Sequence, residues 1–242
     1  MLDAFVKALS QLFTAPLRGV LLKAIGLALA MIVIIGILLQ RLFSALAENG
    51  TNWAEATYDY APHTAWHLLV WVLSVMAGLG IVTGALFLMP VVTAFVGSFF
   101  VDEVADAVER EYYPAEPPGR ALPFMRAIVE GVKTALLALV VYFCALPFVL
   151  FAGFGVLILF VANAYLLGRE YFELAAMRFH PPDEAKALRK QHAGYIFAAG
   201  MVIALFVSIP FVNLATPIFA MAYMVHIHKG LAERRVELIA PR

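Results

Sequence analysis

Arg18 is the residue whose position in this chain points most directly to chemistry. It follows Pro16 in a stretch, Leu17 to Val20, that is typical of the first turn of a helix. A cation at the positive end of a helix dipole is unfavourable unless an anion lies between them. Leu17, Arg18, Gly19 and Val20 therefore predict an oxyanion site made by the guanidinium and backbone N–H groups, with Gly19 permitting close approach. The alternative is that Arg18 binds lipid phosphate and anchors the helix at the membrane surface.

Four further charged residues lie just beyond long apolar stretches. Glu103 and Arg110 are seven residues apart, which places them on one helical face. Arg169 and Glu173 are four apart, so they can pair along a helix. Polar groups near membrane depth are costly and often line a water-filled path, which makes these residues pathway candidates. The alternative is that these residues form a solvated cytoplasmic rim.

Metal sites and enzyme motifs are not recognisable in the sequence. His63 and His67 could chelate a metal, as could His226 and His228, but no carboxylate or cysteine completes either set at useful spacing. HExxH, GxSxG, P-loop and GxGxxG motifs are absent. The formal net charge is zero, so there is no basic field for nucleic acid. We expect no enzyme activity, no cofactor, no metal and no nucleic-acid partner.

The elements that position these residues follow from where charge is missing. The chain is 63% hydrophobic and 14% charged, which is typical of integral membrane proteins. Asp, Glu, Lys and Arg are absent from 24–40, 134–168 and 191–228. A soluble helix needs charge on its wet face, so these stretches use lipid as their solvent. We predict transmembrane helices at 17–47 and 64–100, since each exceeds the roughly 20 residues that span a bilayer.

The remaining apolar sequence predicts two helical hairpins, at 127–168 and 191–228. Both are interrupted near the middle, the first by Pro147, Gly153 and Gly155 and the second by Pro210, Asn213 and Pro217. Two complete spans need about 40 residues plus a turn, so the arms either just span the bilayer or penetrate it in part. Interrupted hydrophobic segments in two halves of a chain indicate a transport pathway, and Asn213 joins the pathway candidates.

Charge placement predicts the orientation in the membrane. Of the 17 Lys and Arg residues, only Arg41 lies in the segment 41–62. The positive-inside rule therefore places the polar loop 48–62 outside and the polar segments 101–123 and 169–190 in the cytoplasm.

The expected fold is a single all-α integral membrane domain, residues 1–242. It contains the two long transmembrane helices, the two Pro/Gly-interrupted hairpins and an N-terminal amphipathic helix at 2–13. The apolar residues of 2–13 follow helical spacing, so this helix is expected to lie on the membrane surface or, alternatively, to pack on a partner.

Four segments, in order, resemble the CysZ sulfate permeases. LFTAPLRGVLL resembles their Pro-containing turn before one or two Arg residues, although Gly19 stands where relatives often carry the second Arg. MPVVTAFVGSFFVDEVADAVE is similar to the Pro and acidic helix that end their second span. AYLLGREYFELAAMRFHPPDEAKALRKQ resembles their central aromatic, acidic and basic motif. IPFVNLATPIFAMAYMVH is similar to their last hairpin, through Pro210, Asn213 and Pro217.

The resemblance implies sulfate uptake across a bacterial inner membrane for cysteine synthesis, by an oligomeric channel or gradient-driven permease. It implies a multi-pass subunit whose anion site matches Leu17–Val20, with sulfate or a related oxyanion, the lipid bilayer and further copies of the chain as partners. The alternative is a membrane structural or regulatory protein that transports nothing and offers 101–126 and 169–190 to cytoplasmic partners.

Overall fold

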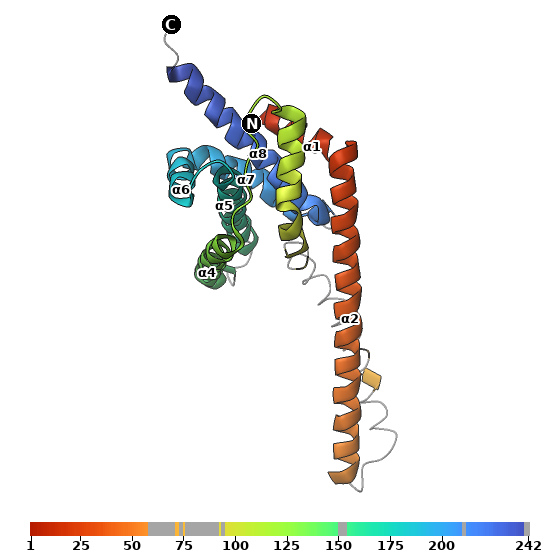
Figure 1. Ribbon diagram of the computed structural model, residues 1–242. Helices are drawn as coiled ribbons and strands as arrows, with labels where there is room; N and C mark the ends of the chain where they lie inside the picture. Colours follow the sequence, from red (N-terminus) through yellow and green to blue (C-terminus); the bar gives the residue numbers. More distant parts are fainter. Residues whose placement is uncertain are drawn as a thin grey trace. The chain divides into compact units, whose positions relative to one another are not determined.

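The computed structural model describes residues 1–57, 71–72, 75, 92, 95–149, 154–209 and 212–239. The elements in these ranges are helical (Figure 1), which confirms the predicted all-α fold class. The chain divides into two compact units, which we call unit 1 (1–24 and 97–242) and unit 2 (25–96).

The named helices follow one another along the chain. They are α1 Leu2–Gln11, α2 Ala15–Thr57, α4 Phe124–Val149, α5 Phe154–Met177, α6 Pro182–Gln191, α7 Ala193–Val207, the 3-10 helix η1 Val212–Ala215 and α8 Thr216–Ile239. Residues 95–112 are helical as well, and we call 97–112, the part in unit 1, the acidic helix because Asp102, Glu103, Asp106 and Glu109 lie on it.

Three helical stretches in the described part of the chain are long and apolar enough to cross a membrane. They are Ala15–Leu46, Met125–Ala145 and Gly155–Met177. α6 and α7 together form a fourth candidate if they are counted as one broken span. The two helices are bent by 92° at their junction. These stretches identify an integral membrane protein with several apolar helices.

α2 is one long helix that contains the predicted span 17–47 and continues beyond it. Residues 48–57, which we expected to be a polar loop, are helical, so this part of the prediction was wrong. The segment contains Ala54, Glu55 and Ala56, which are strong helix formers, and no proline interrupts it. Of the predicted helix 64–100, residues 71–72, 75, 92 and 95–100 are described and helical, and the rest lies outside the described residues.

α8 forms the core of unit 1. All residues from 216 to 229 are buried, and the helix contacts α1, α5, α7 and η1. Phe206 stacks on Phe219 with 4.0 Å between ring centroids, and Phe5 of α1 packs edge-on against both Phe219 and Tyr223. Aromatic contacts of this kind bury much apolar surface and fix how the three helices meet.

α5 and α7 cross where each lacks a side chain. A Cβ at Gly168 would lie 2.8 Å from the carbonyl oxygen of Ile196, and a Cβ at Gly200 would overlap the carbonyl of Ala164. Small residues at such a crossing let the two backbones approach closely, as they do between membrane helices.

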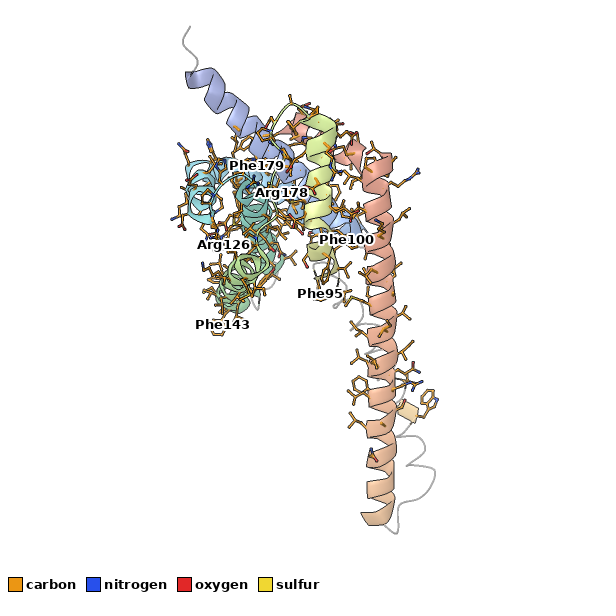
Figure 2. All side chains as sticks on the ribbon, viewed as in Figure 1. Phe95, Phe100, Arg126, Phe143, Arg178 and Phe179 are labelled. Carbon is orange, nitrogen blue, oxygen red and sulfur yellow. The ribbon has the colours of Figure 1, made fainter. Side chains whose placement is uncertain are left out.

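α4 packs on α5, as two arms of the first predicted hairpin would. Tyr142 of α4 donates a hydrogen bond to the Asn163 side chain of α5 over 2.6 Å. The outer surface of α4 is apolar and exposed. Phe143 on this surface points away from the rest of unit 1, and 75% of its surface is accessible (Figure 2). Partial penetration of either hairpin stays a prediction.

α1 has two different faces. Ala4, Ala8 and Gln11 are buried, and α1 contacts α8, which agrees with the partner-packing alternative. Leu2 and Val6 are exposed, so α1 also keeps an apolar surface available for lipid.

Candidate functional site

The predicted oxyanion site at the start of α2 divides into an inner and an outer pair of residues. Leu17 and Val20 are buried in unit 1, whereas Arg18 and Gly19 are exposed. Nothing lies within 4 Å of the position that a Cβ on Gly19 would take, so the space beside Arg18 is open. Leu17 and Val20 therefore anchor the first turn, and the Arg18 guanidinium is presented to the surroundings.

The backbone at this position contributes less than the sequence suggests. The Arg18 N–H donates to the carbonyl oxygen of Thr14 over 2.9 Å and so closes the first helical turn. The N–H groups of Gly19 and Val20 follow inside α2, where carbonyls four residues back accept them. The N–H of Leu17 precedes this ladder, but Leu17 is buried. An oxyanion would thus meet chiefly the Arg18 side chain.

The structure brings one pathway candidate to the same helix. Glu103 of the acidic helix accepts a hydrogen bond from Lys23 Nζ over 3.3 Å, and both side chains are about half exposed. Arg110, on the face that sequence spacing shares with Glu103, lies near Asp106 instead, with 3.8 Å between the charged atoms. Glu103 therefore belongs to the α2 start, and Arg110 does not.

The other pathway candidates lie elsewhere in unit 1. Arg169 and Glu173 form the i,i+4 pair expected from their spacing, at 3.3 Å, and Arg189 of α6 reaches the same Glu173 oxygen at 2.7 Å. Asn213 is buried in η1, and its N–H donates to the carbonyl of Ile209. No interaction among the described residues joins these groups to Glu103 or Arg18, so the candidates form separate clusters.

Sequence reasoning missed Arg178, which follows the end of α5 and, among the described residues, is the cation that binds three carboxylates. Its Nη1 donates to Asp102 over 2.7 Å, its Nη2 donates to Asp106, and its Nε donates to Glu109 over 2.8 Å. Only 1% of the Arg178 side chain is exposed. We call Arg178, Asp102, Asp106 and Glu109 the Arg178 cluster. Burial alone would lower the pKa of Arg178, but Glu109 and Asp106 outweigh burial and raise it.

The segment after the acidic helix is fastened to the same cluster. Glu109 accepts a hydrogen bond from the Gly119 N–H over 2.8 Å, and the Arg178 carbonyl accepts one from the Arg120 N–H over 2.9 Å. A Cβ at Gly119 would lie 2.9 Å from both Arg178 Nε and a Glu109 oxygen. Glycine is therefore the residue that lets this backbone approach the ion pair.

A second buried cation, Lys229 of α8, binds the same segment at Glu116, three residues before Gly119. Its Nζ donates to Glu116 over 2.5 Å and lies 3.8 Å from the centre of the Phe179 ring. His226, one helical turn earlier, is hydrogen-bonded to Tyr113 at 2.8 Å and to Gln11 of α1 at 2.9 Å. The segment 113–120 is thus fixed to α8 and to the residues that follow α5 by contacts with residues far away in sequence.

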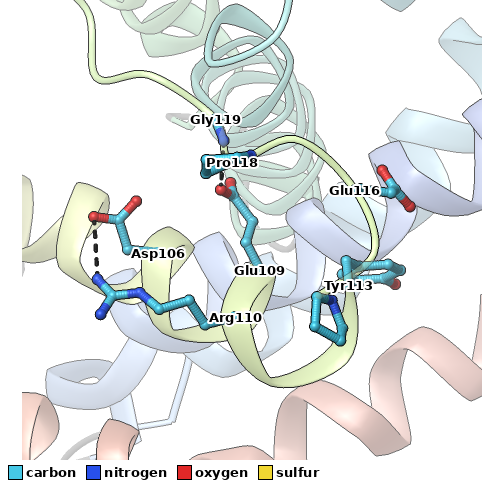
Figure 3. A pocket seen from close by; sticks show the side chains of 8 residues that line it. Asp106, Glu109, Arg110, Tyr113, Glu116, Pro118 and Gly119 are labelled. Atoms are coloured by element: carbon cyan, nitrogen blue, oxygen red, sulfur yellow. Dashed lines mark hydrogen bonds and ion pairs between the residues drawn. The ribbon is translucent and has the colours of Figure 1, made fainter.

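A pocket of about 470 Å³ lies beside the end of the acidic helix (Figure 3). Asp106, Glu109 and Glu116 line it together with Arg110 and Tyr113. The carboxylates are already paired, with Arg178, Arg110 or Lys229. The pocket therefore has little excess charge with which to attract an ion. In the described part of the chain, no group of three His, Cys, Asp or Glu residues could hold a metal.

Comparison with known proteins agrees with the helical membrane architecture. No curated protein matches the chain. The family model described as Sulfate transporter CysZ/Etoposide-induced protein 2.4 matches residues 4–217, which include most of α1, all of α2, the acidic helix and α4 to α7. The chain therefore belongs to the sulfate transporter CysZ/Etoposide-induced protein 2.4 family.

Proposed function

We propose that the protein takes up sulfate across a bacterial inner membrane, as an oligomeric channel or gradient-driven permease, and so supplies sulfur for cysteine synthesis. Membership of a sulfate transporter family supports the substrate class. The observation that carries the proposal is the exposed Arg18 side chain, next to the open space at Gly19, at the start of a helix long enough to span the membrane.

The chemistry of this position suits an oxyanion. Sulfate is a dianion that must lose part of its hydration before it enters a membrane protein, so it needs strong donors in exchange. A guanidinium offers two parallel N–H groups to an oxyanion, and the resulting bonds are charge-assisted. Lys23, five residues further along α2, faces another side of the helix and is paired with Glu103, so the proposed site depends on Arg18. The proposed site can therefore attract sulfate without holding it too tightly for release.

A passive route fits the rest of the chain. The sequence carries no P-loop, so the proposed driving force is the sulfate gradient or a coupled ion gradient. A subunit of 242 residues is too small to enclose a wide channel by itself. We therefore propose that several copies of the chain form the sulfate pathway. The exposed apolar surface of α4, for example at Leu136, Leu139 and Phe143, provides area for lipid and for a second copy.

The proposal is tested by measuring radiolabelled sulfate uptake into liposomes that contain the purified protein. Uptake should exceed that of protein-free liposomes, and unlabelled sulfate should compete. Sulfite and thiosulfate, added in turn, rank the preference among oxyanions. Lys190→Gln, which removes an exposed cation from α6, is the matched control and should transport like the parent. Uptake equal to protein-free liposomes would contradict the proposal and favour the structural or regulatory alternative.

A further inference from the structure

Arg178 binds three carboxylates that share one face of the acidic helix. Asp102, Asp106 and Glu109 are spaced i, i+4 and i+7, and each accepts a hydrogen bond from the one guanidinium. Rotation of the helix about its axis would break these bonds together, because the guanidinium is planar and rigid. The Arg178 cluster therefore fixes the rotation of the acidic helix as well as its attachment.

Stability by itself does not explain such an arrangement. Burying a guanidinium is costly, and a well-packed apolar contact often stabilises a protein as much as a buried ion pair does. The ion pairs additionally fix the orientation of the acidic helix and of the side chains it carries. Glu103 is the neighbour of Asp102 on the acidic helix, so the same rotation that satisfies Arg178 sets where the Glu103 carboxylate points.

Glu103 points to Lys23 of α2, with 3.3 Å between Nζ and the carboxylate. Lys23 lies five residues after Arg18 on the same helix. We propose that Arg178 is a positioning residue: by fixing the rotation of the acidic helix, it holds Glu103 against Lys23, the next cation after Arg18 along α2. This inference rests on the proposed function insofar as it concerns sulfate, whereas the placement of Glu103 can be measured without any anion.

Arg178 also neutralises negative charge on the acidic helix. Asp102 and Asp106 are about half exposed even while Arg178 binds them. Without the guanidinium, three carboxylates would lose their main counter-charge on the acidic helix that also carries Glu103, and, among the described residues, only Asp106 would keep a cation, Arg110. Asp102 would then compete with Glu103 for Lys23, and the added negative field would repel an approaching dianion.

The first measurement reports placement. In a Cys144→Ala background, which removes the single native cysteine, Lys23→Cys and Glu103→Cys are joined by a short bifunctional thiol reagent. Cross-linking should be efficient with Arg178 present and at least severalfold slower with Arg178→Gln. Arg120→Gln is the control, because the Arg120 backbone N–H that reaches Arg178 is kept. Equal cross-linking in parent and Arg178→Gln protein would overturn the positioning role.

The second measurement reports the consequence for sulfate, with the native Lys23 and Glu103 restored. Arg178→Gln should raise the sulfate Kd roughly tenfold, since charges in one network are strongly coupled. Adding Asp102→Asn should recover part of the loss, which a merely unfolded protein would not do. If Arg178→Gln does not fold, Arg178→Lys keeps a buried charge but reaches fewer carboxylates, and intermediate values are expected. Slower cross-linking with an unchanged sulfate Kd would overturn the link to the anion site. Absence of sulfate binding by the parent would contradict the proposed function and leave the cross-linking result standing.

Discussion

Gly97 of the acidic helix lies directly against the ring of Pro217 at the start of α8, and a methyl group added at position 97 would overlap it. Gly97→Ala should therefore push the acidic helix away from α8 and destabilise unit 1 by about 1–3 kcal/mol, the usual cost of overpacking. Thermal unfolding in detergent measures the change. Gly131→Ala is the matched control, because nothing lies within 4 Å of its added Cβ. Equal midpoints for the two variants would show that the contact tolerates a side chain.

Lys229 and Glu116 form an asymmetric pair, since 4% of the lysine side chain is exposed against 40% for the glutamate. Glu116→Gln leaves the buried ammonium without its counter-charge and should cost roughly 2–3 kcal/mol. Lys229→Met keeps the apolar stem, leaves Glu116 in water and should cost only about 1 kcal/mol, mostly the lost contact with the Phe179 ring. Chemical unfolding of both variants checks the order. The reverse order would mean that packing around Lys229 matters more than its charge.

Arg18→Ala should weaken sulfate binding by about 1.5–3 kcal/mol, the range for losing a charge-assisted hydrogen bond. Arg18→Lys should recover only part of the affinity, because an ammonium lacks the planar fork. Folding should barely change, since the side chain is exposed. Isothermal titration of purified variants gives the affinities. Parent-like binding by Arg18→Ala would assign Arg18 to lipid anchoring instead.

The proposed orientation places residue 52 outside and the α5–α7 connection in the cytoplasm. In a Cys144→Ala background, a membrane-impermeant thiol reagent applied to intact cells should label Asn52→Cys and spare Ala187→Cys. Position 187 suits the experiment because it is exposed, whereas Ala185 on the same helix is buried. Labelling at both positions would indicate copies inserted in both directions.

Residue 212 tests whether the second hairpin stays inside the bilayer. Val212 is exposed on unit 1, while its neighbour Asn213 is buried by protein. None of the described residues buries position 212, so lipid or another copy is expected to cover a cysteine there, and we expect slow labelling from either side of the membrane. Rapid labelling from outside would mean that the hairpin crosses completely.

Local patterns predicted the helices well. The charge-free stretches 24–40 and 134–168 fall mainly in helices that are long and apolar enough to cross a membrane, and the i,i+4 rule correctly identified the Arg169–Glu173 pair. The extension of α2 beyond residue 47 was missed, because a polar sequence with good helix formers reads equally well as a loop or as a continuing helix.

Long-range contacts could not be predicted. Arg178 meets carboxylates about 70 residues earlier in the chain, and Lys23 meets Glu103 80 residues later. Helical periodicity shows which residues share one face of a helix. It does not show which other helix packs against that face. The same limit applies to α8, because an apolar helix surrounded by protein and one surrounded by lipid have similar sequences. The burial of all residues from 216 to 229 could therefore not be predicted from the sequence.

The core position of α8 also sets an order of events during synthesis. The ribosome synthesises α1, α2, the acidic helix and α4 to α7 before Thr216, so the first of these helices leave the ribosome without the element around which unit 1 is built. Their inward surfaces stay unmatched throughout that interval, and the contacts with α8 that complete the core of unit 1 form last. A pause in translation before residue 216 would prolong the state most open to membrane proteases.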